Sequence, residues 1–176
     1  MSRSSTPPNA PAVGHTSDRR RWGRAQQDHI IDPYKHATKP HEPTACPQCG
    51  AVFHRGRWQW AEKPAGAKDA LCQACHRIND QFPAGVITLS GPFVAAHRQE
   101  IIGLVRNQEE AERPEHPLNR VMNITEEAPD RLVISTTDIH LPRRIGEALS
   151  HAYHGALTED FDKEGYFVRV NWHRDA

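Results

Sequence analysis

Four cysteines arranged as two C-x-x-C pairs constrain this 176-residue chain more than any other feature. They are Cys46, Cys49, Cys72 and Cys75, and the sequence contains no other cysteine. A tight turn within each pair brings both sulfurs within reach of one metal ion, so two pairs supply the four soft ligands of a tetrahedral zinc site. The 22 residues between the pairs slightly exceed the usual zinc-ribbon spacing of about 15–20. The sequence therefore predicts a zinc ribbon that holds one structural zinc ion.

Other uses of four cysteines fit the sequence less well. Disulfides are typical of small secreted proteins, but the N-terminus is polar and lacks the apolar segment of an export signal. A dithiol redox centre requires only one C-x-x-C pair. A catalytic zinc ion needs an open position for water, which four thiolates would close. Iron is also bound by four thiolates, so the choice between zinc and iron stays open.

Composition predicts a soluble, cytoplasmic protein. Hydrophobic residues make up 37% of the chain, which also contains 14 prolines. No apolar run approaches the roughly 20 residues that span a bilayer, so we expect no membrane association. The length is sufficient for one ordinary domain and one small module.

Charge is distributed unevenly, although the formal net charge is zero. Residues 1–90 contain twelve basic and seven acidic side chains, whereas residues 91–176 contain ten basic and fifteen acidic ones. The first half is therefore +5 and the second half −5. This asymmetry favours contact between a polyanion and the N-terminal half, and leaves the acidic C-terminal domain for a protein partner or for solvent.

Residues 1–43 are predicted to form a disordered or extended arm. The first 17 residues are rich in serine and proline and contain too few apolar side chains to build a core. Four arginines around one tryptophan follow, a combination that suits a phosphate backbone and a stacked base. These candidate nucleic-acid-binding residues are Arg19, Arg20, Arg21, Trp22 and Arg24. The alternative interpretation is a solvated basic linker. The prolines that follow disfavour both helix and sheet.

Residues 44–82 are predicted to form the ribbon. Val52, Phe53, Trp58 and Trp60 favour two short strands, with a turn or bulge at Gly56. Within this segment, Arg55, Arg57 and Trp58 form a basic and aromatic cluster that is a second candidate for nucleic-acid binding. The alternative is that the tryptophans fill the small core of the ribbon. A short helix is predicted over residues 73–81.

Residues 84–176 are predicted to form an α+β domain. The pattern indicates strands over 86–89, 120–126, 131–137, 157–161 and 166–172. One helix is predicted from Pro92 to about Glu112, with His97 on its buried stripe. A second helix is predicted to start near Asp138, which would cap it, and to stop at Gly155. The order β-α-β-β-α-β, with one extra short strand, is typical of the ferredoxin-like split-βαβ fold.

That fold would leave one sheet face open. Some RNA-binding modules stack bases on such a face. Phe167 and Arg169 would serve this purpose here, although the sequence favours Phe167 as a core residue and Arg169 as an ordinary surface charge.

Motifs of the common enzyme classes are absent from the sequence. There is no phosphate-binding glycine loop, no G-x-S-x-G and no H-E-x-x-H. His151 and His154 are three positions apart but have no obvious third metal ligand, and Arg144 with Glu147 suggests a surface ion pair. The sequence therefore predicts a protein that is not an enzyme and has no small-molecule substrate.

Two strings resemble a small bacterial family of uncharacterised proteins over residues 30–174. The first runs from Cys46-Pro47 to Gln59-Trp60, and the second from Thr136-Thr137-Asp138 to Ile145-Gly146. More distantly, the cysteine pairs and the following domain resemble the N-terminal region of the archaeal and eukaryotic export adaptor of the large ribosomal subunit, Nmd-three. This resemblance implies that the four cysteines are metal ligands and that the protein associates with RNA or with the ribosome.

Three hypotheses follow from the sequence. The favoured one is a non-enzymatic adaptor that uses the arm and the ribbon to contact RNA or the ribosome, with the large subunit favoured. The alternative is a redox- or zinc-responsive regulator that acts on a protein partner, because oxidised thiolates release zinc. A metal-dependent hydrolase would require an open metal site, which the sequence does not provide.

Overall fold

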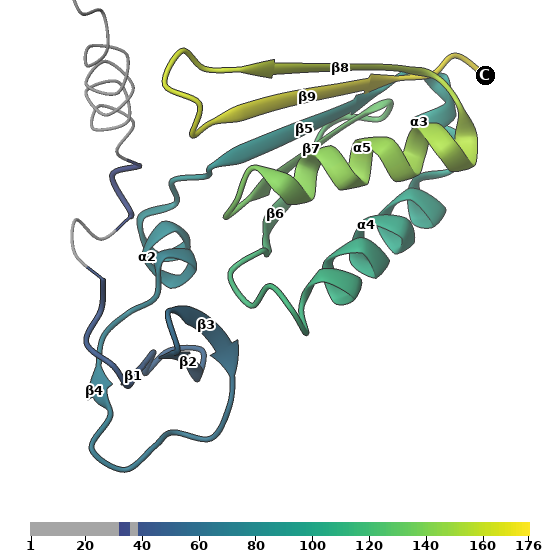
Figure 1. The fold of residues 1–176 in the computed structure, drawn as a ribbon. Coiled ribbons are helices and arrows are strands. Elements are labelled where there is room, and N and C mark those ends of the chain that lie inside the picture. Colours follow the sequence, from purple (N-terminus) through teal and green to yellow (C-terminus); the bar gives the residue numbers. More distant parts are fainter. Residues whose placement is uncertain (1–31, 36–38) are drawn as a thin grey trace, which may run out of the picture. The chain divides into compact units, whose positions relative to one another are not determined.

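The computed structural model describes residues 32–35 and 39–176 (Figure 1). The predicted arm residues Arg19, Arg20, Arg21, Trp22 and Arg24 lie outside this part of the chain. The described residues mix helices with two β-sheets, which confirms the predicted α+β class. The four-stranded sheet occupies the cysteine-containing segment, and the five-stranded sheet lies in the C-terminal segment.

The four-stranded sheet is built from short strands in the order β3-β2-β1-β4. Its strands are β1 (Thr44–Ala45), β2 (Ala51–His54), β3 (Arg57–Trp60) and β4 (Lys68–Asp69), and helix α2 (Gln73–Asp80) follows. β1 pairs antiparallel to β2 and parallel to β4, so it joins the hairpin to the strand that precedes the second cysteine pair. The predicted helix over 73–81 is confirmed.

A two-residue turn joins β2 to β3. Arg55 and Gly56 both have positive φ, 52° and 77°, as in the type I′ turns that match the twist of a hairpin. The carboxylate of Glu42 accepts hydrogen bonds from the backbone N–H of Arg55 (2.8 Å) and of Gly56 (3.0 Å). Glu42, which precedes the first strand of the sheet, therefore fixes the β2–β3 turn through these two hydrogen bonds.

The five-stranded sheet has the order β6-β7-β5-β9-β8. Its elements are β5 (Gly85–Ser90), α3 (Pro92–Ala96), α4 (Arg98–Glu112), β6 (Val121–Ala128), β7 (Arg131–Thr136), α5 (His140–Tyr153), β8 (Ala156–Phe161) and β9 (Val168–His173). All neighbouring strands are antiparallel except β5 and β9, which are parallel. The predicted order of strands and helices is present.

The sheet differs from the simple split-βαβ pattern in one respect. In that pattern the strand that directly follows the second helix, which is β8 here, lies beside the first strand, β5. Here β9 takes that place and β8 lies at the edge. Val168, Val170 and Trp172 of β9 are buried, whereas five of the six residues of β8 are exposed. Burial of Val168, Val170 and Trp172 in the centre of the sheet is favoured by about 25 cal/mol per Å² of apolar surface.

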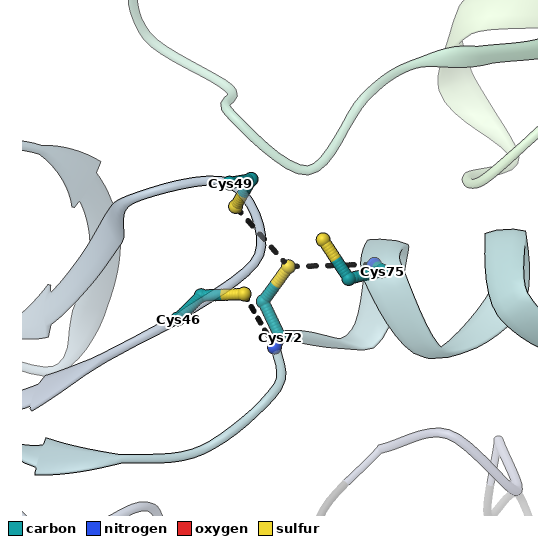
Figure 2. A group of neighbouring side chains, drawn as sticks. All are labelled: Cys46, Cys49, Cys72 and Cys75. Atoms are coloured by element: carbon teal, nitrogen blue, oxygen red, sulfur yellow. Dashed lines mark hydrogen bonds between the residues drawn. The ribbon is translucent and has the colours of Figure 1, made fainter.

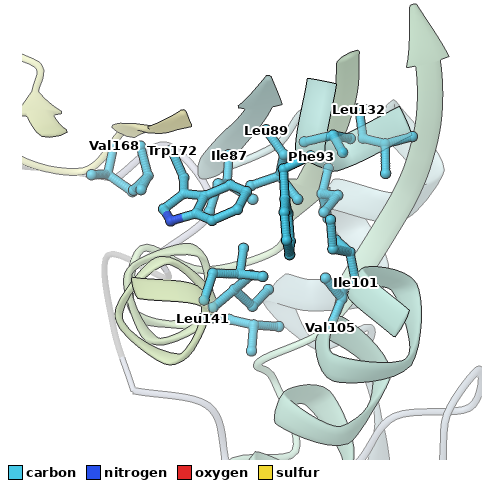
Figure 3. Close-up of a cluster of buried hydrophobic side chains, with 14 residues drawn as sticks. Ile87, Leu89, Phe93, Ile101, Val105, Leu132, Leu141, Val168 and Trp172 are labelled. Carbon is cyan, nitrogen blue, oxygen red and sulfur yellow. The ribbon is translucent and has the colours of Figure 1, made fainter. Parts of the chain in front are cut away.

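Helices α3, α4 and α5 cover one face of this sheet (Figure 1). Ile87, Leu89 and Leu132 point from the strands toward the helices, and Trp172 is fully buried among them (Figure 3). Ile134 belongs to the same buried cluster. The remaining core residues are Phe93, Val94, Ile101, Val105, Leu141, Ile145, Leu149, Val168 and Val170. No cysteine belongs to this core.

The opposite sheet face carries small and polar side chains. Thr88 is only partly buried, while its parallel partner Asn171 is exposed. Arg169 is also exposed, and its guanidinium lies 4.8 Å from the ring centre of the half-buried Phe167. The two residues that would stack bases are thus in contact with each other.

The prediction of a single helix from Pro92 to Glu112 is wrong in one respect, because the helix is interrupted at His97. His97 has φ −118° and ψ 24°, which are not helical values. The break lets α3 pack on β5 and β7 while α4 packs on α5. His97 is not a core residue: it is partly exposed, stacks on Phe93 and lies 3.3 Å from Glu100.

Asp138 supplies capping hydrogen bonds at the start of α5, as predicted, although Ile139 occupies the N-cap position itself. One carboxylate oxygen of Asp138 accepts from the N–H groups of His140 (2.7 Å) and Leu141 (3.0 Å). The predicted pair of Arg144 with Glu147 is wrong, because Arg144 forms an ion pair with the buried Glu112 of α4. Glu112 is buried where α4 packs on α5, and a buried carboxylate needs a charged partner, whereas an exposed carboxylate such as that of Glu147 is solvated by water.

Candidate metal centre

The first cysteine pair lies in a tight turn after β1. The N–H of Gly50 donates to the carbonyl of Cys46 (2.9 Å), and the N–H of Cys46 donates to the carbonyl of Ala51 (2.8 Å). Gly50 has φ 81°, a conformation that glycine adopts without steric cost. This turn holds Cys46 and Cys49 on the same side of the backbone.

The second pair is positioned by helix α2. Cys72 is the N-cap of the helix, and its Sγ accepts from the N–H of Cys75 at 3.4 Å. The N–H of Cys72 in turn donates to Sγ of Cys46 at 3.4 Å, which links the two pairs (Figure 2). The spacing of three residues places both sulfurs at the first turn of α2.

All four sulfurs converge on one point (Figure 2). They lie within 4.8 Å of one another, and the Sγ atoms of Cys49 and Cys72 are 3.8 Å apart. A tetrahedral ion with Zn–S bonds of about 2.3 Å would separate its sulfurs by about 3.8 Å. The residues present therefore fit a single ion, and they are the four that the sequence predicts.

Burial and backbone donors perturb the thiols of this cluster in opposite directions. Burial raises the pKa of Cys46, but N–H groups of Cys72, Cys49 and Gln48 outweigh it and lower the pKa to about 7. Burial raises the pKa of Cys72 and of Cys75, and neighbouring thiolates raise both further. Several thiolates cannot ionise together in a buried site unless a cation is present, so this site is suited to a metal ion.

Arg120 is a residue of the site that the sequence did not indicate. Its Nη1 lies 3.5 Å from Sγ of Cys75, and its Nη2 lies 3.9 Å from Sγ of Cys72. Leu118, two residues earlier, packs against the cysteine cluster. Arg120 directly precedes β6 and lies 45 residues beyond Cys75, so no local pattern connects the two.

The ribbon residues predicted to bind nucleic acid divide into two groups. Arg55 and Arg57 are exposed at the tip of the β2–β3 hairpin. Trp58 is partly buried against the cysteine cluster and contacts Phe53 edge to face, with ring centres 5.5 Å apart. Trp58 thus packs against the small core, in line with the alternative interpretation. Trp60 is 36% exposed and donates from Nε1 to the carbonyl of Arg113 at 2.7 Å.

A polar hollow of about 430 Å³ lies between the end of α4 and the start of α5. It is lined by Glu112, His116, Asn119, His140, Arg143, Arg144 and Glu147. Three of these residues come from the second motif string. Arg144 is paired with Glu112 and Arg143 with Glu159, so each arginine of the hollow has a carboxylate partner.

His151 and His154 are exposed.

No family model, curated protein or solved structure matches this chain. Among the described residues, no helix combines the length and the apolar character needed to cross a membrane.

Proposed function

We propose that this protein is a non-enzymatic, zinc-binding adaptor that associates with RNA or with the ribosome, most of all with the large subunit. The convergence of four sulfurs at single-ion distances supports the metal-binding part of the proposal. The association with RNA is inferred from the exposed arginines of the β2–β3 hairpin. In this proposal the four-stranded sheet is a zinc ribbon, and the five-stranded sheet is a variant of the ferredoxin-like fold with β9 inserted beside β5.

The bound ion has a structural role. Four thiolates complete a tetrahedral zinc shell, which leaves no position for a water nucleophile. The ribbon sheet has only two- and four-residue strands, and its apolar core is small, so metal ligation supplies a large part of its folding free energy. Elemental analysis of the purified chain should find one zinc per molecule. Zinc far below that ratio, or an equivalent amount of iron, would contradict the assignment.

RNA contact is assigned to the tip of the β2–β3 hairpin. Arg55 and Arg57 are exposed there, and the bonds from Glu42 keep the turn in place. Arginine suits phosphate because its planar fork presents several N–H donors. Trp58, the third predicted contact of the ribbon, packs against the cysteine cluster and is partly buried. The arm arginines Arg19, Arg20, Arg21 and Arg24, with Trp22, remain part of this proposal.

Binding to single-stranded RNA and to isolated ribosomal subunits should be measured over a series of salt concentrations. We expect affinity to fall steeply as salt rises, because phosphate contacts release counterions. Replacing both Arg55 and Arg57 by alanine should weaken binding and reduce the slope of log affinity against log salt by about 1–2. Arg131→Ala is the matched control, since Arg131 is exposed on the acidic domain. Equal effects of the two changes would refute the interface.

One observation favours the second candidate function, a redox- or zinc-responsive regulator with a protein partner. Cys49 is partly exposed, whereas the other three cysteines are buried. Hydrogen peroxide would take two electrons from two thiolates and two protons from solvent, giving one disulfide and two water molecules, and zinc would be released. Zinc release at mild peroxide concentrations, followed with a zinc-sensitive dye, would favour the regulator. Resistance to peroxide would favour the structural ion.

A further inference from the structure

The guanidinium of Arg120 approaches the sulfur cluster from the α4–β6 connection. Its two terminal nitrogens face the sulfurs of Cys75 and Cys72 at 3.5 and 3.9 Å, within the range of N–H···S hydrogen bonds. The cysteines belong to the ribbon, and Arg120 leads into the five-stranded sheet. This contact therefore joins two segments that are otherwise built around separate cores.

Arg120 is held in place by its own part of the chain. Its Nε donates to the carbonyl of Pro117 at 2.8 Å, and its backbone N–H donates to Oγ1 of the buried Thr137 at 2.9 Å. The ring centre of Trp60 lies 5.9 Å from the guanidinium carbon. The orientation of the guanidinium is thus set by groups other than the sulfurs.

The net negative charge of a divalent ion with four thiolates explains why a cationic side chain is needed beside the cysteines. A divalent ion with four thiolates has a net charge of −2, and three of its four ligands are buried here. One guanidinium offsets half of that charge. Its N–H groups also withdraw electron density from the sulfurs, which makes them weaker nucleophiles. Groups that hydrogen-bond to metal ligands commonly tune affinity and reactivity in this way.

We propose that Arg120 is a positioning residue of the metal centre. It stabilises the metal-bound thiolates of Cys72 and Cys75 and slows their reaction with electrophiles. Its contact with the thiolates also makes the position of the α4–β6 connection depend on whether the metal is bound. This inference rests on the metal site of the proposed function. It adds a link between the ribbon and the five-stranded sheet that only the loaded site makes strong, because neutral thiols are weak acceptors.

The test uses the full chain loaded with Co²⁺, whose thiolate-to-metal charge-transfer band reports the electron density on sulfur. Arg120→Met removes the charge and the donors but keeps a long side chain. Arg120→Lys retains a charged donor. Arg113→Met is the matched control, because Arg113 also lies over Trp60, at 5.7 Å. For each variant we would measure cobalt stoichiometry, metal affinity by chelator competition, band energy, and the rate of metal release by N-ethylmaleimide.

We expect Arg120→Met to bind one cobalt ion with an affinity lower by about tenfold to a hundredfold. Its charge-transfer band should move to lower energy, and alkylation should release the metal faster. Arg120→Lys should recover part of each change, and Arg113→Met should match the wild type. A band energy and release rate unchanged in Arg120→Met would overturn the proposal.

Two further outcomes distinguish a failure of the proposed metal site from a failure of the role of Arg120. If the wild type itself binds no stoichiometric metal, the proposed function fails before Arg120 is tested. If Arg120→Met does not fold, Arg120→Gln provides the same measurements with a neutral side chain of similar polarity. Wild-type band energy and release rate in a folded Arg120→Gln would also overturn the role of Arg120.

Discussion

Asp32 and Arg77 form an ion pair across 45 residues of sequence, with Oδ1 and Nη2 2.6 Å apart. The side chain of Arg77, on α2, is only 2% exposed. The guanidinium also lies 4.4 Å from the ring centre of Tyr34, whose hydroxyl donates to Asp80. Residues 32–35 were predicted to belong to an extended arm. They instead form a turn that packs on the helix carrying Cys75.

Asp32→Ala should therefore destabilise the ribbon. It leaves the buried Arg77 without its carboxylate, which costs about 3 kcal/mol. Asp69→Ala is the control, because its partner Lys63 is 55% exposed and such surface pairs contribute about 0–1 kcal/mol. Urea unfolding of both variants measures the difference. The interpretation is contradicted if Asp69→Ala costs as much as Asp32→Ala.

Two helical glycines should respond in opposite ways to alanine. A Cβ on Gly146 of α5 would lie 2.7 Å from Cδ1 of Leu157 and 3.1 Å from Cγ1 of Val170, so overpacking should cost about 1–3 kcal/mol. A Cβ on Gly103 of α4 would meet nothing within 4 Å, so Gly103→Ala should stabilise by up to about 1 kcal/mol. Thermal unfolding of the two variants tests this. Stabilisation by Gly146→Ala would show that α5 does not pack so closely on the sheet.

Asp138 should make stability fall as pH rises. Burial raises its pKa above the ordinary value of 3.8, although N–H donors from Leu141 and His140 partly offset the effect. The folded state then binds protons more strongly, so this contribution is complete below pH 3.8 and is lost as pH rises through the folded pKa.

Asp138→Asn removes that ionisation and keeps an oxygen that can cap α5. The free energy of unfolding of the wild type minus that of the variant should therefore decrease as pH rises through this window. Urea titrations at several pH values give this difference, in which metal loss at low pH is common to both proteins. A difference that increases with pH would mean that the carboxylate is stabilised in the fold.

If the cysteine cluster binds the proposed metal ion, its removal should unfold only part of the protein. Trp58 packs on the cysteine cluster, whereas Trp172 is buried in the separate core of the five-stranded sheet. A strong chelator should shift part of the tryptophan emission to longer wavelength as Trp58 becomes hydrated. Methyl NMR signals of Ile87 and Ile134 should keep their dispersion. Collapse of those signals together with the emission change would show that both parts unfold as one unit.

Local patterns in the sequence were sufficient to predict the four-cysteine cluster and most of the helices and strands. The spacing within each C-x-x-C pair predicts sulfurs on one side of a turn, and the four do converge. The strand predicted over 166–172 is present as Val168–His173 with alternating buried and exposed side chains, and the helix predicted to start near Asp138 begins at His140. These predictions succeed because turn geometry, strand period and capping depend on residues a few positions apart.

Only the tertiary structure decided which distant residues meet. It placed Arg120 on the sulfurs, Asp32 on Arg77, and β9 instead of β8 beside β5. In the tertiary structure the predicted helix is also interrupted at His97, and Trp58 packs against the cysteine cluster. Each outcome follows from burial and charge compensation between segments far apart in the chain, and these energies depend on packing that no short stretch of sequence encodes.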